Sequence, residues 1–254
     1  MITMKDLIDE CGEDLAALGY KCKEEGAFGL NVCSLVVDNQ ECVEKTGFEE
    51  GEYLILNCKE LPSGKRECLE YVSKYVQKAI RFLMQRSRLT KKSRILIVGL
   101  GNPHILADSL GTKVLDYTRI KANKEKTNVY KFAPNIFANT GINAYDVVSM
   151  LSVWLDLDGV IIIDSLATDC IDRLGCSIQL NTAGITPGSA VNNLGKKLGK
   201  NTLGIPCISI GVPLMFFGDK VGKKNLLLTP KDIHQNVDDL ALVIADAINE
   251  LLIK

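Results

Sequence analysis

Two aspartates follow short apolar segments of the chain, and their carboxyl groups are the strongest candidates for chemistry. Asp108 lies in the loop after the aliphatic run 95–98, and Asp164 directly follows the run 160–163. Two carboxyl groups held close together cannot both ionise freely, so their pKa values separate and the pair supplies one base and one acid. A base that activates water and an acid that protonates a leaving amine can hydrolyse an amide without a cofactor. A single aspartate after a strand is also commonly a helix cap or loop brace, and spacing alone leaves that alternative open.

Other catalytic and binding motifs are absent or incomplete. Gly99-x-Gly101-x-x-His104 lacks the third glycine of the dinucleotide fingerprint, and no Gly-x-x-x-x-Gly-Lys-Ser/Thr occurs. Ser189 is not in a nucleophile elbow, and His104 and His234 fit no catalytic triad order. We interpret His104 as a loop residue near the site and His234 as a residue on a helix surface. No histidine is obviously placed beside the two acids, so we predict neither a metal nor a cofactor.

The two aspartates need strands that bring them to the same edge of a sheet. The segments 94–99 and 160–163 are aliphatic without polar interruption, which is typical of buried parallel strands. In open α/β sheets, ligands bind outside the carboxyl ends of such strands. The chain between Asp108 and Asp164 is long enough for the crossover that parallel pairing requires. We therefore expect the two carboxyl groups to meet.

Periodicity and turn residues predict the remaining elements. We expect further strands over 30–37, 52–58, 176–180 and 206–211, and helices over 4–18, 65–87, 108–118, 147–155 and 229–252. Thr229 is the expected N-cap of the last helix, residues 119–142 are expected to be irregular, and Trp154 is expected to anchor the core. The pattern predicts one α/β domain over residues 1–254, with a mostly parallel central sheet flanked by helices.

Composition narrows the classes of partner. Lys and Arg number 30 against 31 Asp and Glu, so the net charge of -1 creates no general attraction to nucleic acid or to an anionic membrane. The basic run 86–94 carries no interleaved aromatic residues for base stacking and is interpreted as a solvated linker. No apolar run approaches the roughly 18 residues of a membrane span, and the charged N-terminus is no signal peptide. We predict a cytoplasmic protein with no nucleic-acid or membrane partner.

The cysteines give no sign of disulfide or zinc chemistry. Their number, nine, is odd, and no Cys-x-x-Cys occurs. This pattern argues against a disulfide framework and a zinc ribbon. We expect free thiols packed as small hydrophobic side chains.

An ordered set of segments resembles the germination proteases of spore-forming bacteria, which are unusual aspartic-type endopeptidases. The similarity extends from about Thr46 to Phe216. Its specific parts are Val98-Gly-Leu-Gly-Asn102, Asp108-x-Leu-Gly111, Thr140-Gly-Ile142, Ile163-Asp-x-Leu-Ala167, Gly184-Ile-x-Pro-Gly-Ser189 and Leu203-Gly-Ile-Pro-x-Ile-x-Ile-Gly-Val-Pro213. An ordered set of this length is far more specific than any one of its motifs.

The resemblance implies a function and a site. It places the two catalytic aspartates of the family at Asp108 and Asp164. It implies a metal-free endopeptidase that degrades small acid-soluble spore proteins during germination, in the spore core or forespore. It also implies the three-layer fold of hydrogenase maturation endopeptidases and a homotetramer. Residues expected to bind substrate or support the site are Asn102, His104, Gly184, Pro187, Gly188 and Ser189.

Two other interpretations stay open. Segments near the aspartates depart from the family pattern: His104-Ile-Leu-Ala107 stands where Asn-Val-Thr-Pro is common, and Thr182-Ala-Gly-Ile-Thr-Pro187 where Asp-Thr-Gly-Ile-His-Pro is common. These departures fit a catalytically inactive, spore-associated relative that acts as a binding protein. Ile97-Val-Gly-Leu-Gly-Asn-Pro103 is also similar to the start of peptidyl-tRNA hydrolases, which are esterases, although the Arg-His-Asn segment of that family is missing.

Overall fold

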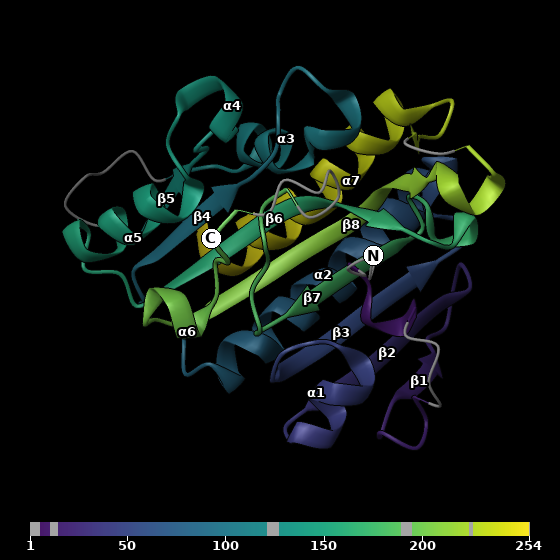
Figure 1. Ribbon diagram of the computed structural model, residues 1–254, viewed down its shortest axis with the longest axis horizontal. Helices are drawn as coiled ribbons and strands as arrows, with labels where there is room; N and C mark the ends of the chain where they lie inside the picture. The colour runs from purple at the N-terminus through teal and green to yellow at the C-terminus, as the bar shows by residue number, and fades with distance from the viewer. Residues whose placement is uncertain (1–5, 11–14, 121–126, 189–194, 224–225, 254) are drawn as a thin grey trace.

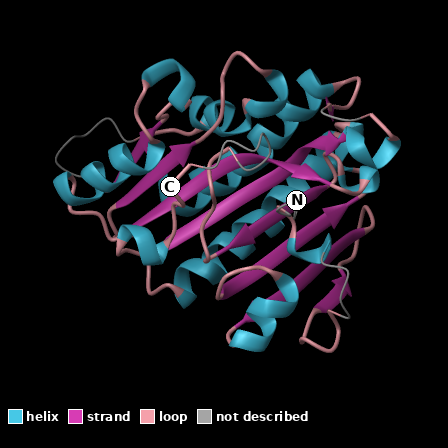
Figure 2. Cartoon of the chain, viewed as in Figure 1, coloured by secondary structure: helices cyan, strands magenta, loops and turns pink. Residues whose placement is uncertain are grey.

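The central feature is a mixed β-sheet covered by helices (Figures 1 and 2). The computed structural model describes residues 6–10, 15–120, 127–188, 195–223 and 226–253. Within these residues the sheet has nine strands, in the order β1-β2-β3-β7-β8-β6-β4-β5, with β9 paired to β8. The strands are β1 (Lys21–Glu24), β2 (Leu30–Val37), β3 (Gly51–Cys58), β4 (Ile95–Gly99), β5 (Val129–Phe132), β6 (Gly159–Thr168), β7 (Ser177–Asn181), β8 (Cys207–Phe217) and β9 (Leu227–Leu228).

Strand direction divides the sheet into two halves. β5, β4, β6 and β8 are parallel, whereas β1, β2, β3 and β7 pair antiparallel, and β7 joins the halves by pairing antiparallel with β8. Parallel neighbours need a crossover of about a dozen residues or more, and the link between β1 and β2 is too short for one. The predicted α/β fold is confirmed, and parallel pairing is limited to the half that carries the aspartates.

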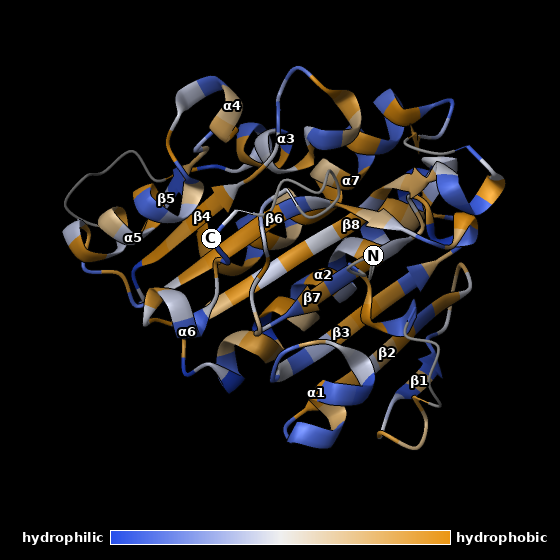
Figure 3. Ribbon diagram, in the orientation of Figure 1, coloured by the Kyte–Doolittle hydropathy of each residue, from blue (hydrophilic) through white to orange (hydrophobic). Residues whose placement is uncertain are grey.

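Helices cover both faces of the sheet, which makes three layers. α2 (Arg66–Arg86), α3 (Leu110–Tyr117) and α7 (Ile233–Ile248) pack on one face, and a π-helical turn (Asn249–Ile253) follows α7. α1 (Gln40–Thr46), α5 (Ala144–Trp154) and α6 (Lys200–Leu203) pack on the other, and α4 (Phe137–Thr140) is a single turn after β5. Alternate residues of β6 contact the two layers: Ile161 and Ile163 the first, Val160 and Ile162 the second. Figure 3 shows the resulting apolar central strands.

Several predicted elements are confirmed and others need correction. The strand over 30–37 is β2, the helix over 65–87 is α2, and the segments 94–99 and 160–163 lie in β4 and β6. The region 119–142, expected to be irregular, contains β5 and α4. The last helix begins at Ile233 with Asp232 as its N-cap, so Thr229 is not the cap.

The expected helix over 4–18 is wrong where the structure describes it. Ile8–Glu10 form one 3-10 turn and residues 15–19 form a turn, while residues 4, 5 and 11–14 lie outside the described residues. Leu7 and Ile8 are fully buried but belong to different clusters, Leu7 with β4 and β6 and Ile8 with β2 and β3. Because Leu7 and Ile8 are buried in different clusters, this segment does not form the helix that the spacing of its apolar residues predicts.

Two predictions about single side chains are also wrong. Trp154 is 76% exposed, because α5 turns Val148 and Ser152 toward the sheet instead. Cys22 and Cys33 are register partners on β1 and β2 and form a disulfide, so these two cysteines are not free thiols. None of the helices in the described parts of the chain combines the length and apolar character of a membrane span.

Candidate active site

Asp164 lies inside a strand, although the sequence pattern predicts that the strand ends at residue 163. β6 continues to Thr168, and Asp164 pairs with Gly211 of β8. Because side chains alternate along a strand, Asp164 projects to the same face as Ile162, the face covered by α5 and the N-terminal segment. Asp164 is only 5% exposed, and one of its carboxylate oxygens accepts a hydrogen bond from the Ser165 N–H at 2.9 Å.

A glycine turn brings Asp108 back toward the end of β4. Gly101 has φ of 100°, and a Cβ atom there would lie 1.9 Å from the Asp108 carbonyl oxygen, so only glycine fits. Asp108 ends a 3-10 turn (Leu106–Asp108), and its Oδ2 accepts a hydrogen bond from the Asn102 N–H at 2.9 Å. This hydrogen bond ties the carboxylate to the loop that leaves β4.

Close packing at Gly111 explains the Asp-x-Leu-Gly spacing. A Cβ atom at Gly111 would lie 2.4 Å from the Leu100 carbonyl oxygen and 2.6 Å from that of Ile163. The Leu100 N–H also donates to the Ile163 carbonyl oxygen at 2.8 Å. The first turn of α3 therefore lies directly against the ends of β4 and β6. Asp108 precedes this contact by three residues and Asp164 follows Ile163, which places both acids at one junction.

The pKa values of both acids are raised, that of Asp164 more strongly than that of Asp108. Burial raises the pKa of Asp164 well above its usual value, and the negative charges of Asp108 and then Asp6 raise it further against the opposing Ser165 hydrogen bond. Burial also raises the pKa of Asp108, while the Asn102 N–H lowers it. Asp164 is the more deeply buried of the two and its pKa is raised more strongly, so Asp108 ionises at the lower pH. This arrangement can supply one acid and one base.

The other predicted site residues fall into two groups. Asn102 is buried and holds the loop, because its N–H binds Asp108 and its Oδ1 accepts from the His104 N–H at 3.0 Å, while His104 itself is exposed. Gly184 and Pro187 make hydrogen bonds near their own loop, Gly184 N–H to Asn181 Oδ1 and Gly195 N–H to the Pro187 carbonyl oxygen. Gly188 is in the same loop, and Ser189 lies outside the described residues. Substrate binding by these residues stays a prediction.

Sequence reasoning missed residues from β7 and the N-terminal segment. The Asp6 carboxylate accepts a hydrogen bond from the Ala167 N–H at 2.9 Å, and the Gln179 side chain binds the Asp6 and Ile8 main chain. The helix expected over 4–18 is predicted from the spacing of its apolar residues, which gives no role to Asp6. The described residues contain no group of three His, Cys, Asp or Glu side chains arranged to hold a metal ion.

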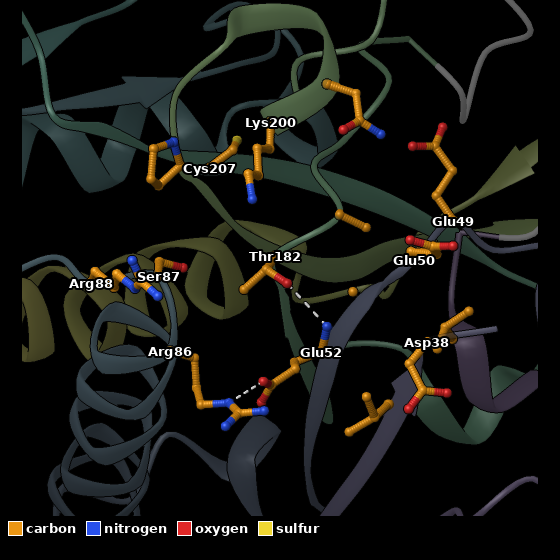
Figure 4. A pocket seen from close by; sticks show the side chains of 16 residues that line it. Asp38, Glu49, Glu50, Glu52, Arg86, Ser87, Arg88, Thr182, Lys200 and Cys207 are labelled. Atoms are coloured by element: carbon orange, nitrogen blue, oxygen red, sulfur yellow. Dashed lines mark hydrogen bonds and ion pairs between the residues drawn. The ribbon is translucent and has the colours of Figure 1, made fainter.

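A separate polar pocket of about 770 Å³ lies at the other end of the central strands (Figure 4). Cys207, the first residue of β8, lines it and is the register partner of Val160. Asp164 is four residues further along β6, or about 13 Å. Neither aspartate lines this pocket, whose walls contain the ion pair between Arg86 and Glu52.

Comparison with known proteins adds a family assignment. Residues 3–222 match the family model described as germination protease. The chain is 33% identical over 205 residues to the germination protease of Bacillus subtilis, covering 77% of this chain and 55% of that one. It is 30% identical to that of Caldanaerobacter subterraneus subsp. tengcongensis, covering 77% and 62%. The chain thus spans less than two thirds of the relatives it matches.

The chain is also similar to a solved structure. A NiFe-hydrogenase maturation protease, HycI from Thermococcus kodakarensis KOD1, aligns with a TM-score of 0.39 and 19% identity. The alignment covers 62% of this chain and 94% of that one.

Proposed function

The chain belongs to the germination protease family, and from this membership we propose that it is an endopeptidase whose acid and base are Asp164 and Asp108. The observation that carries the proposal is the junction at Gly111, which places a half-buried Asp108 and a buried Asp164, both with raised pKa values, in family-matched segments. Withdrawing two neighbouring carboxyl groups from solvent destabilises a folded chain, so such a pair is more typical of a reaction centre than of a brace. By resemblance, the substrates are small acid-soluble spore proteins degraded in the spore during germination.

We assign the roles of the two acids from the order in which they ionise, Asp108 before Asp164. Asp108 takes a proton from a water molecule, whose oxygen then bonds to the carbonyl carbon of the substrate peptide. Asp164 gives its proton to the amide nitrogen as the carbon–nitrogen bond breaks. The two carboxyl groups end the reaction with their protonation states exchanged, and a proton transfer from Asp108 to Asp164 restores the starting state. No step needs a redox partner, and the water oxygen is retained in the new carboxylate.

Cleavage of acid-soluble spore proteins tests this proposal. Purified protein would be incubated with them, and fragments would be identified by mass spectrometry. We expect Asp108→Asn and Asp164→Asn each to reduce cleavage by about 10²- to 10⁴-fold, and the double variant to be little worse because the two acids act as a unit. Asp156→Asn is the matched control, because Asp156 is 93% exposed. Cleavage by both single variants at the wild-type rate would overturn the assignment of the two acids.

A non-catalytic function is the second candidate, and segment 104–107 is the observation that favours it. This segment departs from the family pattern directly before Asp108, and His104 and Ile105 in it are exposed. An inactive relative would bind the spore proteins without producing fragments. Binding measured by calorimetry together with uncleaved substrate in the mass spectra would favour this candidate.

Assembly is a further part of the proposal. The family resemblance favours a homo-oligomer, specifically a tetramer. Light scattering coupled to size-exclusion chromatography would measure the mass in solution, and a mass of 27.8 kDa at working concentration would contradict the tetramer.

A further inference from the structure

Two anchors hold the N-terminal segment beside the aspartates. The Asp6 carboxylate accepts a hydrogen bond from the Ala167 N–H, at the point where the register between β6 and β8 shifts. The Gln179 side chain donates to the Asp6 carbonyl oxygen at 3.0 Å and accepts from the Ile8 N–H at 2.9 Å. Leu7, between these contacts, is fully buried in the cluster that contains β4 and β6. The position of Asp6 is therefore fixed from both sides.

The sheet register explains why these anchors bring Asp6 near Asp164. Asp164 pairs with Gly211, and Gly211 pairs with Gln179, so the three form one row across β6, β8 and β7. Side chains of directly paired residues project to the same face of a sheet. Gln179 and Asp164 thus stand on one face about 10 Å apart. Asp6, which binds Gln179 and β6 at once, lies between these two strands.

Few charges act on Asp164. Among the described residues, the charged groups that influence it are Asp108 from the loop after β4 and Asp6 from the N-terminal segment. The neighbouring acids of that segment face elsewhere: Asp9 pairs with Arg173, and Glu10 contacts Thr168 and the Asp169 N–H. Asp6 is the acid of the segment that acts on the site.

We propose that Asp6 is a positioning residue that holds a negative charge beside Asp164 and thereby keeps Asp164 the proton donor of the pair. This inference rests on the proposed function for its catalytic consequence, but not for its electrostatic one. Without the Asp6 charge, Asp164 would release its proton at lower pH. The acid would then be lost over part of the working range.

The Asp6→Asn variant removes the negative charge but can keep the hydrogen bond, because the Asn side-chain oxygen can still accept from the Ala167 N–H. The pH dependence of kcat/KM and the carboxyl titration of Asp164, followed by carbon-13 NMR, would be measured for this variant and the wild type. We expect the alkaline limb to move to lower pH, with activity there reduced by about tenfold and activity on the acidic side unchanged. The Asp164 titration should move in the same direction.

Two further variants make the test specific. Glu10→Gln removes an acid from the same segment and should leave both curves where they are in the wild type. Asp6→Glu restores the charge and should move the curves back. Thermal unfolding of each variant would establish that it is folded.

The outcomes separate this inference from the proposed function. A folded Asp6→Asn variant with an unmoved Asp164 titration overturns the inference, even if Asp108→Asn and Asp164→Asn abolish cleavage. A moved titration in a protein that cleaves nothing supports the role of Asp6 and defeats the proposed peptidase activity.

Discussion

The aspartate site and the pocket at the opposite end of β6 and β8 differ in how their ionisable side chains are exposed to solvent and paired. At the site, Asp108 and Asp164 would carry like charges if both ionised, Asp164 is buried and Asp108 is half-buried, and the pKa of each is raised. In the pocket, Arg86 is 58% exposed and faces an opposite charge on Glu52. The pocket has a volume of about 770 Å³, yet Arg86 and Glu52 in its wall neutralise each other. Carboxyl groups with raised pKa values, more than cavity size, therefore mark the region suited to acid–base chemistry.

We expect substitutions of glycine to differ most between the aspartate site and the pocket in their effect on stability and cleavage. Ala is favoured over Gly inside a helix by about 1 kcal/mol, which would make Gly111→Ala stabilising if space allowed. A Cβ atom at Gly111 would instead lie within 2.6 Å of three backbone atoms. Backbone atoms cannot yield as a flexible side chain does, so we expect a net loss of about 2–3 kcal/mol and loss of cleavage. Urea unfolding and the cleavage assay would measure both.

Gly51, at the pocket, is the matched position for this test. A Cβ atom there would lie no closer than 3.0 Å to Ala183 and 3.2 Å from Thr182 Oγ1. Small shifts can relieve such contacts, and we expect Gly51→Ala to cost about 1 kcal/mol or less with cleavage retained. Equal losses at the two positions would contradict the close packing of α3 against β4 and β6.

The sequence predicts β4 and β6, the strands that position the two aspartates, better than their surroundings, for a physical reason. Asp108 and Asp164 follow short apolar runs without polar interruption, and a buried strand leaves its pattern in consecutive residues. The Cys22–Cys33 disulfide and the Asp6 contact with Ala167 depend on pairing between distant segments, which no local pattern encodes. The prediction for Trp154 is wrong for a different reason. The helix α5 is apolar on several sides, so the spacing of apolar residues does not identify which face of the helix is buried.

Stability should depend on pH through the site and not through exposed acids. An aspartate in an unfolded chain titrates near pH 4, and burial raises the pKa of Asp164 in the folded protein. Between these two pKa values the folded state binds more protons than the unfolded state, so the free energy of unfolding falls as pH rises. Asp164→Asn removes this contribution. We expect the variant to lose less stability than the wild type between pH 4 and the raised pKa, as urea unfolding at several pH values would measure.

The control for pH dependence is again Asp156→Asn. Its side chain is 93% exposed, and the variant should follow the wild-type curve. If Asp164→Asn also followed that curve, Asp164 would titrate alike in the folded and unfolded chain, and the distinction between the two ends of the sheet would fail.

The smallest effect is expected in the pocket, from the ion pair between Arg86 and Glu52. Arg86 is 58% exposed, so solvent screens the attraction and the pair should contribute only about 0–1 kcal/mol. A double-mutant cycle with Arg86→Ala, Glu52→Ala and the double variant would isolate this coupling from other losses. Cleavage should stay at the wild-type rate in all three, because Cys207 at the pocket and Asp164 are separated by about 13 Å along the strands. A coupling above about 2 kcal/mol, or a fall in cleavage without unfolding, would instead connect the pocket to the aspartates.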